Sequence, residues 1–463
     1  MSFNFINRGI IFGCLALSGC MVGPDYHRPS LVLPAHYKAA PGWVEAQPAD
    51  AAPKGAWWEN FKDPVLDRLE PQVAVNNASL AADYYAYQQA LAIAQEARGG
   101  LFPTLSLTSG ATRARQDIGL GTSGNFEGQV SWSLDLWGKI RRQVQSDTAQ
   151  AQASEADLAN ATLSAQASLA SDYVYLRSAD ENIDLLKKTA IAYQESLRIA
   201  QNKYAAGTVS ESDILTARTA LDGAQSSLVA EYAVRAQYEH AIAVLMGRAP
   251  AELSIAPGPQ IQFIPVAPPQ VPSTLLQRRP DIAAAERQMD AENAQIGVEE
   301  AAFYPDLSLS ALGGFTANPI TELFTTSSTL WSLGTTATAD LFTGGARGKA
   351  VEAAQAAYKE SVETYRQTVL TSFQQVEDDL TNLQIYAQQA KVQDRAVADA
   401  TRAVQIALNE YEAGTADYTT VASAQVTLLA DQQTALSIRQ NRLLASIALY
   451  QDLGGGFTAA NLH

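Results

Sequence analysis

The sequence predicts a mainly helical protein with a membrane β-barrel portion, built from two copies of one helix–strand–strand–helix plan. Three observations support this prediction. One motif occurs twice, as KYAAGTVSES from Lys203 and EYEAGTADYT from Glu410, so that its Tyr, Ala, Gly and Thr repeat 207 positions apart. Long stretches lack proline, which favours continuous helices. Each half also contains stretches in which apolar and polar residues alternate, the period of a β-strand.

The duplication covers most of the chain, at offsets between 202 and 207 residues. The corresponding pairs are LFPTLSL from Leu101 and AFYPDLSLS from Ala302, Asp135-Leu136-Trp137 and Asp340-Leu341-Phe342, and VLMG and QDLG, which end at Gly247 and Gly454. These offsets predict two halves of about 180 residues with one structural plan. The proline-rich segment 248–273 is expected to join them as an equatorial linker.

Each half is expected to contain the same elements in the same order. The first repeat, 63–247, is predicted to have a helix, strands at about 103–113 and 126–137, a long helix at 139–204, a tip turn at 205–210 and a helix at 211–246. The second repeat, 274–454, is predicted to have a helix, strands at about 305–315 and 331–342, a long helix at 346–411, a tip turn at 412–417 and a helix at 418–450. A tail at 455–463 follows.

The long helices are predicted to be continuous and narrow. No proline occurs between Lys139 and Tyr204 or between Gly348 and Tyr411. At a rise of about 1.5 Å per residue, these helices extend roughly 95–100 Å, far more than the thickness of a membrane. Their seams have coiled-coil spacing and are rich in alanine, so they cannot form a thick core. They indicate a hollow, water-filled cylinder.

The second strand of each half alternates between apolar and polar residues, over Phe126–Leu136 and Trp331–Leu341. Strands of about ten residues with one apolar face are typical of outer-membrane β-barrels, and Trp132, Trp137 and Trp331 are expected in an interfacial aromatic girdle. An antiparallel sheet on a soluble core is the alternative. Four strands cannot close a barrel, and open strand edges are not tolerated in lipid. If the strands span a membrane, the chain must oligomerise.

The first residues resemble a bacterial lipoprotein signal. A short apolar run follows Arg8, and Leu17-Ser18-Gly19-Cys20 places small residues before a cysteine. We expect 1–19 to be removed as a signal peptide, together with Cys14, and Cys20 to be acylated at the start of an extended segment, 20–62. A plain signal peptide with an incidental cysteine is the alternative. Met21, rather than aspartate, follows the cysteine, as is usual for lipoproteins exported to the outer membrane.

Composition and isolated motifs exclude several function classes. The formal charge of −16 over 463 residues argues against nucleic acid as a partner. The sequence has no run of 18 apolar residues, so no transmembrane helix is indicated. GLGTSG at Gly119 has dinucleotide-binding spacing, but no helix is expected after it, so we interpret it as a flexible extracellular loop. VEDDL around Asp378 is interpreted as a solvated helix face. No catalytic constellation, metal-ligand set or cofactor motif is found, so we predict that the protein is not an enzyme.

Four motifs resemble the TolC-like outer membrane efflux protein family, in particular its lipoprotein branch, the NodT-type outer membrane factors of resistance-nodulation-division pumps. They are GPDYHRP from Gly23, WWENFKDPVLDRL from Trp57, LLQRRPDIAAAE from Leu275 and the closing GGG from Gly454. The resemblance covers nearly the whole mature chain. It implies a homotrimer in the outer membrane with a twelve-stranded β-barrel on a long coiled-coil tunnel of twelve helices in the periplasm.

The resemblance also implies a function and partners. The protein would be the exit channel of a tripartite efflux pump, working with a periplasmic adaptor (membrane fusion) protein and an inner-membrane pump to export drugs, toxic compounds or metal ions. The exit channel of a type I protein secretion system, with the same fold, is one alternative. A non-conducting structural lipoprotein made of coiled coils is another. The exported substrate is not specified by the residues.

The twin turns are the candidate adaptor-contacting tips, at Gly207, Thr208, Gly414 and Thr415. A glycine ends each long helix, because it adopts a left-handed backbone conformation without steric penalty. Three residues after each glycine lies a residue of the type that starts helices, Ser210 or Asp417. We therefore expect the side chain of Asp417 to cap the following helix.

The periplasmic gate is expected next to these tips, at Tyr204, Asp213, Tyr411 and Asp417. Relatives often carry acidic residues after the second tip, but this sequence has Thr420 and Ser423 at those positions. A carboxylate ring would then come from Asp213, one per protomer. The two tyrosines are expected to narrow the mouth.

Overall fold

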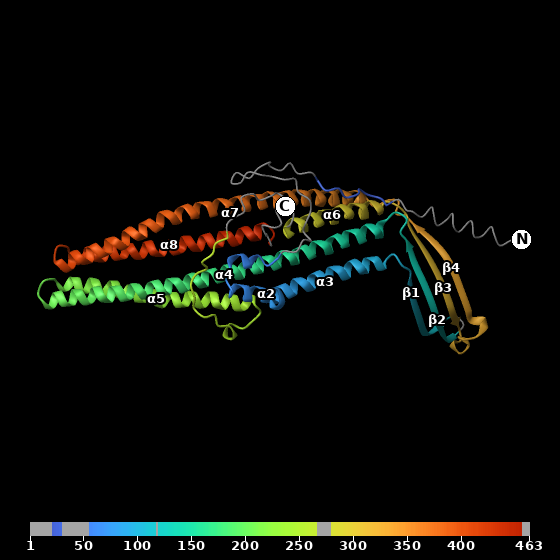
Figure 1. The fold of residues 1–463 in the computed structure, drawn as a ribbon. Helices are drawn as coiled ribbons and strands as arrows, with labels where there is room; N and C mark the ends of the chain where they lie inside the picture. The colour runs from blue at the N-terminus through green and yellow to red at the C-terminus, as the bar shows by residue number, and fades with distance from the viewer. Residues whose placement is uncertain (1–20, 30–54, 117–118, 266–278, 456–463) are drawn as a thin grey trace. The chain divides into compact units, whose positions relative to one another are not determined.

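The computed structural model describes residues 21–29, 55–116, 119–265 and 279–455. These residues form two compact units, which we describe separately (Figure 1). The sheet unit combines the described parts of Met1–Val32, Tyr84–Asp157 and Asp281–Thr368, and the hairpin unit those of Leu33–Asp83, Leu158–Pro280 and Val369–His463. Each unit therefore contains segments from both halves of the chain. None of the described helices is both long enough and apolar enough to cross a membrane.

The sheet unit contains one antiparallel sheet of four strands. In spatial order these are β1 (Thr104–Gln116), β2 (Gly119–Leu134), β3 (Asp306–Ala317) and β4 (Thr329–Thr338). Because side chains alternate between the two faces of a strand, the register collects most of the apolar residues of the four strands on one face, with Leu312 and Leu330 on the other. We call this the apolar face; its residues include Leu105, Leu107, Phe126, Val130, Trp132, Leu134, Leu307, Leu309, Ala311, Phe315, Trp331 and Leu333.

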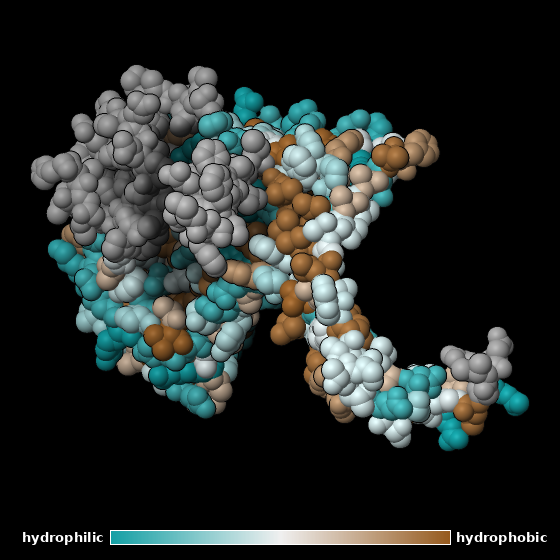
Figure 2. Space-filling view, turned by 90° about the vertical axis from the view of Figure 1, so that its right-hand side faces the viewer, coloured by the Kyte–Doolittle hydropathy of each residue, from teal (hydrophilic) through white to brown (hydrophobic). Residues whose placement is uncertain are grey.

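The apolar face is open to its surroundings. The side chains of Trp331 and Leu333 are 80% and 77% exposed, and brown apolar residues are visible at the surface in Figure 2. The opposite face carries mainly serine, threonine and glycine, together with Glu127. The sheet therefore has the two-sided pattern predicted from the alternation.

The strands differ in extent from the sequence-based prediction. β2 begins at Gly119 rather than near 126, because the ladder with β1 continues through Gly124, paired with Ala111, to Gly119, paired with Gln116. The interpretation of GLGTSG as a flexible loop was therefore wrong. β4 ends at Thr338, so that Phe342 lies beyond the sheet and is exposed.

Defined side-chain contacts connect strands to helices. Asp135 follows β2, and its two carboxylate oxygens accept hydrogen bonds from the N–H groups of Ile140 and Arg141, each at 3.0 Å. This caps the start of α4 (Lys139–Ala205). Trp137 stacks on Tyr304 at 4.7 Å and donates its indole N–H to the Pro305 carbonyl at 2.9 Å. Trp137 is thus a fixed part of the junction between the two halves of the sheet.

Two helices lie where the sequence predicted one. α2 (Leu66–Asn76) and α3 (Ala78–Gly99) are separated at Asn77. The Asn77 side-chain oxygen accepts hydrogen bonds from the N–H groups of Ser79 and Leu80, and its amide donates to the Leu245 carbonyl at 3.0 Å. Asn77 therefore starts α3 and holds that start against the end of α5 (Glu211–Leu245).

The two helical hairpins are long and continuous. α4 has 67 residues and turns into α5, while α7 (Ala346–Ala413) has 68 residues and turns into α8 (Tyr418–Asp452). At about 1.5 Å per residue, α4 and α7 each extend about 100 Å. α6 (Pro280–Ala301) leads into β3. The hairpin core near the tips combines alanine and tyrosine residues, such as Ala200, Ala217 and Tyr418, with a few aliphatic residues, such as Leu197 and Leu221.

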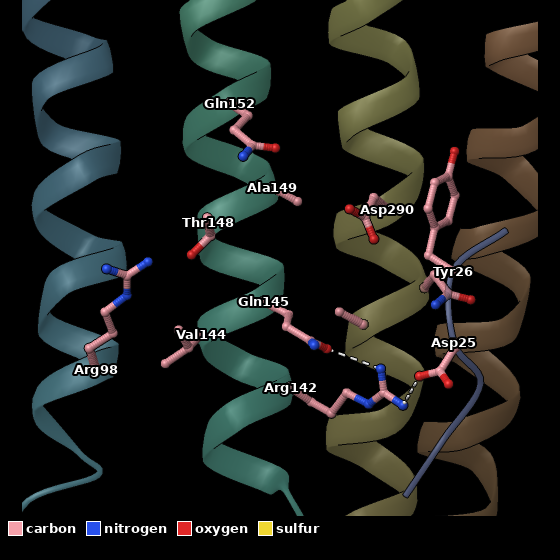
Figure 3. Close-up of a pocket in the computed structure, with 12 residues that line it drawn as sticks. Asp25, Tyr26, Arg98, Arg142, Val144, Gln145, Thr148, Ala149, Gln152 and Asp290 are labelled. Carbon is pink, nitrogen blue, oxygen red and sulfur yellow. Dashed lines mark hydrogen bonds and ion pairs between the residues drawn. The ribbon is translucent and has the colours of Figure 1, made fainter. Parts of the chain in front are cut away.

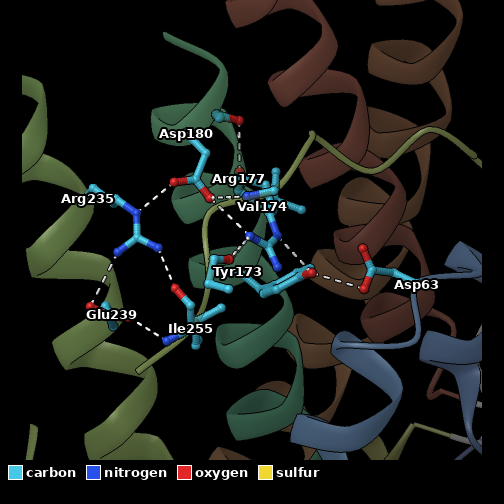
Figure 4. Close-up of polar contacts among 11 residues, drawn as sticks. Asp63, Tyr173, Val174, Arg177, Asp180, Arg235, Glu239 and Ile255 are labelled. Carbon is cyan, nitrogen blue, oxygen red and sulfur yellow. Dashed lines mark hydrogen bonds and ion pairs between the residues drawn. The ribbon is translucent and has the colours of Figure 1, made fainter. Parts of the chain in front are cut away.

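A charged network holds the linker against α4 and α5 (Figure 4). Asp180 accepts hydrogen bonds from Arg177 at 3.0 Å and from Arg235 at 2.6 Å. Glu239 accepts from the Ile255 N–H at 2.6 Å, and Arg235 donates to the Ile255 carbonyl. These charges are mostly buried but paired, so their desolvation is compensated. The described part of the predicted linker, up to residue 265, includes the short 3₁₀ turn η2 (Pro250–Glu252).

Candidate functional site

The twin turns have the same hydrogen-bonding pattern. In the first, the Gly207 N–H donates to the Tyr204 carbonyl and the Thr208 N–H to the Lys203 carbonyl; in the second, Gly414 and Thr415 donate to the equivalent carbonyls. This is the Schellman arrangement, in which a residue with positive φ closes the helix. φ is +70° at Gly207 and +77° at Gly414.

Each tip threonine adds a second contact to its turn. The Thr208 hydroxyl donates to the Lys203 carbonyl at 2.9 Å, and the Thr415 hydroxyl donates to the Glu410 carbonyl at 3.0 Å. A Cβ placed on Gly207 or Gly414 would have no atom within 4 Å. Both glycines are therefore required for their backbone conformation and not for lack of space.

The helices that follow the tips begin without side-chain caps. Ser210 and Asp417 occupy the N-cap positions with extended backbones, but neither side chain makes the capping hydrogen bond. The expectation that Asp417 caps α8 was therefore wrong. Asp417 is exposed. The Ser210 hydroxyl instead donates to the Asp213 carboxylate at 3.2 Å.

The two tip tyrosines occupy different environments although their local sequences match. Tyr411 is only 2% exposed, whereas Tyr204 is 46% exposed. The Tyr411 hydroxyl donates to Oδ2 of Asp213 at 3.3 Å, which connects α7 of the second hairpin to α5 of the first. Burial and the nearby Asp213 charge raise the pKa of Tyr411, so it stays protonated and able to donate at neutral pH.

Further groups surround the Tyr411 ring. The ring contacts Tyr418 edge-on at 5.3 Å, and the Lys203 ammonium lies over it at 5.1 Å from the centroid. The Tyr411 side chain is thus part of the hairpin core within the protomer. Of the two tyrosines expected to narrow the mouth, only Tyr204 is exposed enough to do so.

The two positions after the second tip at which we expected acidic residues from the family resemblance line a groove. Thr420 and Ser423 of α8 face Ala400 and Ala403 of α7 across a cavity of about 490 Å³. The small side chains leave the two helices of this hairpin incompletely filled near the tip. The groove is neutral at Thr420 and Ser423, and the assignment of Asp213 as the acidic gate residue stays a prediction.

The segment after Cys20 is docked on three helices of the sheet unit (Figure 3). Arg142 of α4 is buried and donates to the Val22 and Gly23 carbonyls and to the Asp25 carboxylate, each at 3.0 Å. Asn293 of α6 donates to the Pro24 carbonyl at 3.0 Å. Cys20 itself lies outside the described residues, as do 1–19, 30–54 and 456–463.

A polar cavity of about 380 Å³ adjoins this segment, lined by side chains that include Asp25, Tyr26 and Asp290. Burial raises the pKa values of Tyr26 and Asp290. A Cβ on Gly23 would lie 2.4 Å from the Cα of Gly297, and a Cβ on Gly297 would lie 2.9 Å from the Arg142 side chain. The close approach of two glycines therefore explains part of the GPDYHRP motif.

The second arginine of the LLQRRPD motif connects three helices. Arg279 precedes α6 and donates to the Asp452 carboxylate of α8 at 3.1 Å and to Gln375 of α7 at 2.8 Å. Beside it, burial and the Asp452 charge raise the pKa of Asp379 to about 8. Asp379 belongs to VEDDL, so the interpretation of that stretch as a solvated face holds for the exposed Asp378 but was wrong for the buried Asp379.

The comparisons with known proteins identify the family. The sequence profile of the outer membrane efflux proteins matches residues 69–248 and 271–455. This chain belongs to the outer membrane efflux protein family. The two matched segments are separated by residues 249–270, which lie within the predicted linker 248–273. Members of the family are channel proteins of the outer membrane and not enzymes.

Relatives of this outer membrane efflux protein align over almost their full length. The solvent efflux pump outer membrane protein SrpC of Pseudomonas putida is 29% identical, covering 97% of this chain and 98% of the relative. The pyoverdine export outer membrane protein OpmQ of Pseudomonas aeruginosa is 30% identical, covering 97% of each chain.

Solved structures of this kind have the same fold. The outer-membrane channel OprN superimposes with a TM-score of 0.85 at 27% identity, covering 94% of this chain and 99% of that one. The Campylobacter jejuni CmeC outer membrane channel superimposes with a TM-score of 0.85 at 23% identity, covering 95% of each chain. The predicted fold class, a helical tunnel with a barrel portion, is thereby confirmed. Outer membrane efflux proteins of tripartite pumps work with adaptor and inner-membrane pump partners.

Sequence reasoning named most of the tip residues but missed how they combine. Asp213 and Tyr411 were both gate candidates, yet nothing predicted that they form a pair. The docking of GPDYHRP on Arg142 was also missed. The one available signal for this docking was the basic residue Arg142 itself, which lies at the start of a long helix shortly after Gly138.

Proposed function

We propose that this chain is the outer-membrane exit channel of a tripartite efflux pump, a passive conduit from the periplasm to the exterior. The observation that carries the proposal is the combination, in one chain, of an open apolar sheet face and helices of 67 and 68 residues. The relatives are named for efflux of solvents and for export of pyoverdine. The substrates of this chain are accordingly drugs, toxic compounds or metal ions supplied by its pump.

The functional unit in this proposal is a homotrimer. Within the described residues, β1 pairs only with β2 and β4 only with β3, so the sheet of four strands has two open edges. Open edges are not stable in lipid. Pairing of β4 with β1 of the next protomer, repeated three times, closes a twelve-stranded barrel, consistent with the minimum of about eight strands for a spanning barrel.

The N-terminal part of the chain is the lipid anchor in this proposal. Residues 1–19 are the signal peptide, Cys20 is acylated, and 20–62 is the extended segment that follows. Two or three acyl chains anchor a protein firmly, since each buried CH₂ contributes about 0.8 kcal/mol. In support, Met21 lies against Gly138, next to the Trp137–Tyr304 stack at the end of the sheet.

The helical tunnel extends into the periplasm in this proposal, and the tips at Gly207, Thr208, Gly414 and Thr415 contact the adaptor. The Asp213–Tyr411 pair is part of the gate, because it joins two hairpins that must separate when the mouth opens. Repeats 63–247 and 274–454 supply one hairpin each, and the linker 248–273 lies at the equator of the tunnel.

Reconstitution of the purified full-length protein into planar bilayers tests the proposal. We expect discrete conductance steps from a preparation that light scattering identifies as trimeric. A stable monomer in mild detergent, or trimers without conductance under any voltage, would contradict it. Mass spectrometry of the mature N-terminus tests the anchor separately: an unmodified Cys20 would refute acylation without affecting the channel.

A further inference from the structure

The loop between β3 and β4, residues 318–328, folds back onto the sheet. The ring of Phe324 packs edge-on against Phe126 at 5.9 Å and against Phe315 at 5.6 Å. Phe126 of β2 and Phe315 of β3 are directly paired in the register and lie on the apolar face. Phe324 therefore covers two neighbouring strands on that face.

Two more apolar side chains fix the loop to the same face. A Cβ on Gly124 would lie 2.7 Å from Cγ1 of Ile320 and 3.4 Å from Cδ2 of Leu323. Gly124 is two residues before Phe126, so it belongs to the same face. The missing side chain at Gly124 thus provides the place where Ile320 and Leu323 are seated.

The loop has a defined internal structure. It contains two short 3₁₀ turns, η4 (Ile320–Glu322) and η5 (Thr326–Ser328). The Glu322 carbonyl accepts hydrogen bonds from the hydroxyls of Thr325 at 2.8 Å and Ser328 at 2.7 Å, and Ser328 is buried. These bonds hold Phe324 in place, with 71% of its side chain exposed.

The loop lies at the Phe126 end of the apolar band, opposite the Leu134 end from which the chain enters α4. Five rows of the apolar face, from Leu134 to Phe126, span about 27 Å along the strand, or about 20 Å along the membrane normal at a tilt of about 40°. An outer-membrane barrel needs an apolar band of about 25 Å. The row beyond Phe126 contains only Ala111, Gly124 and Ala317, which have too little side chain to complete it.

We infer that the β3–β4 loop completes the membrane-facing surface, with Ile320, Leu323 and Phe324 contacting lipid acyl chains at the outer boundary of the bilayer. This inference rests on the membrane orientation of the sheet in the proposed function. The loop continues an apolar face that is already exposed, and it supplies the side chains that the last row lacks. It lies outside the barrel wall and does not cover the pore.

The position of the loop argues for lipid rather than for a neighbouring subunit. Phe324 lies over β2 and β3, the two central strands, whereas a neighbouring protomer would pair with the edges β1 and β4. Phe324, exposed on the outward side, faces the medium that surrounds the barrel wall.

A depth-quenching experiment tests this inference. Full-length protein with Phe324→Cys is labelled with bimane and reconstituted into phosphatidylcholine vesicles whose acyl chains carry bromine near the headgroup end. We expect the lipid bromine to lower the bimane emission relative to that in unbrominated vesicles, while aqueous iodide has little effect. Because Phe324 is largely exposed, its replacement does not threaten folding. The unsubstituted protein, treated identically, gives the background from Cys20.

Matched positions separate the possible failures. Leu333→Cys, in the middle row of the apolar face, reports that face in vesicles whose acyl chains carry bromine near the bilayer centre, and Ser332→Cys reports the opposite face. If bromolipid quenches position 333 but iodide quenches 324, the loop is a solvent-exposed cover and the inference is refuted while the membrane orientation stands. If neither quencher reaches 324, another protein surface covers it, which also refutes the inference. If position 333 is not quenched by bromolipid, the membrane orientation of the sheet fails as well.

Discussion

Replacing Tyr411 by phenylalanine removes one hydroxyl and, with it, the hydrogen bond from α7 to Asp213 on α5. The O–O distance of 3.3 Å is longer than the usual range for a hydroxyl donor, so we take about 1 kcal/mol rather than the larger values of well-formed bonds to charged groups. The phenyl ring keeps the contacts to Tyr418 and Lys203. Asp213 is half-buried and can be hydrated once its partner is lost.

The effect is multiplied in the proposed trimer. If the three tips open together, losing one bond per protomer shifts the equilibrium between closed and open states by about 3 kcal/mol, or roughly a hundredfold. We expect Tyr411→Phe channels in planar bilayers to show higher open probability and larger mean conductance than the parent. The trimer itself should be unaffected.

The duplication supplies the control. Tyr204→Phe makes the same chemical change at the equivalent position of the first hairpin, where the side chain is exposed. It should leave the open probability unchanged. If Tyr411→Phe behaves like the parent, or if both variants open the channel equally, the assignment of the Asp213–Tyr411 pair to the gate is refuted.

Three further predictions concern stability, the tips and ion selectivity. Burial raises the pKa of Glu70, which is 0% exposed, from 4.5 to about 9, so the folded chain keeps a proton that the unfolded chain releases, and the free energy of unfolding falls as pH rises between these values. Glu70→Met should remove this cost, which is of the order of 5 kcal/mol at pH 8. Thermal denaturation should therefore show a stabilisation of the variant that grows with pH, whereas a pH-independent difference would contradict this prediction. Gly207→Val and Gly414→Val should leave trimers in the membrane but abolish drug resistance, because a left-handed residue with a Cβ costs about 1 kcal/mol or more. Asparagine at the same positions should retain resistance. Normal resistance of both valine variants would show that the tips do not contact the adaptor. Cation selectivity of the closed pore should be modest and mostly lost in Asp213→Asn, measured from reversal potentials across a salt gradient, and strong selectivity that survives this change would exclude Asp213 as the gate charge.

Helix lengths followed from the sequence because proline is absent over long stretches and because glycine marks both helix ends. The structure places α7 at Ala346–Ala413, against a predicted 346–411. The start of β2 was missed, because Gly119–Gly124 has no apolar alternation and its pairing depends on the neighbouring strand. The break at Asn77 was also missed, although its cap is local: asparagine is a preferred N-cap residue, and its side-chain oxygen accepts from the N–H groups of Ser79 and Leu80. Only its contact with the Leu245 carbonyl depends on tertiary structure.

The candidate site shows even more clearly what local sequence patterns cannot predict. Tyr204 and Tyr411 lie in matching motifs, yet only Tyr411 is buried, because the surroundings of the two hairpins differ. Spacing predicted a cap at Asp417, but side-chain rotation is decided by tertiary contacts that spacing does not contain. The tip glycines were predictable because backbone conformation at a helix end is determined locally.

The docked N-terminal segment constrains the order of events when the protein is made. Arg28 donates to the hydroxyl of Tyr365, 337 residues later, and Pro24 accepts from Asn293, 269 residues later. Contacts between residues so far apart in the sequence form late, since the intervening chain must first be synthesised and closed into a loop. The docked residues, from Val22 to Arg28, therefore cannot take up their final contacts until α6 and α7 have been made. If Cys20 is acylated early, as proposed, lipid alone holds the chain at the membrane at that stage, and Arg142 binds the Val22 and Gly23 carbonyls only later.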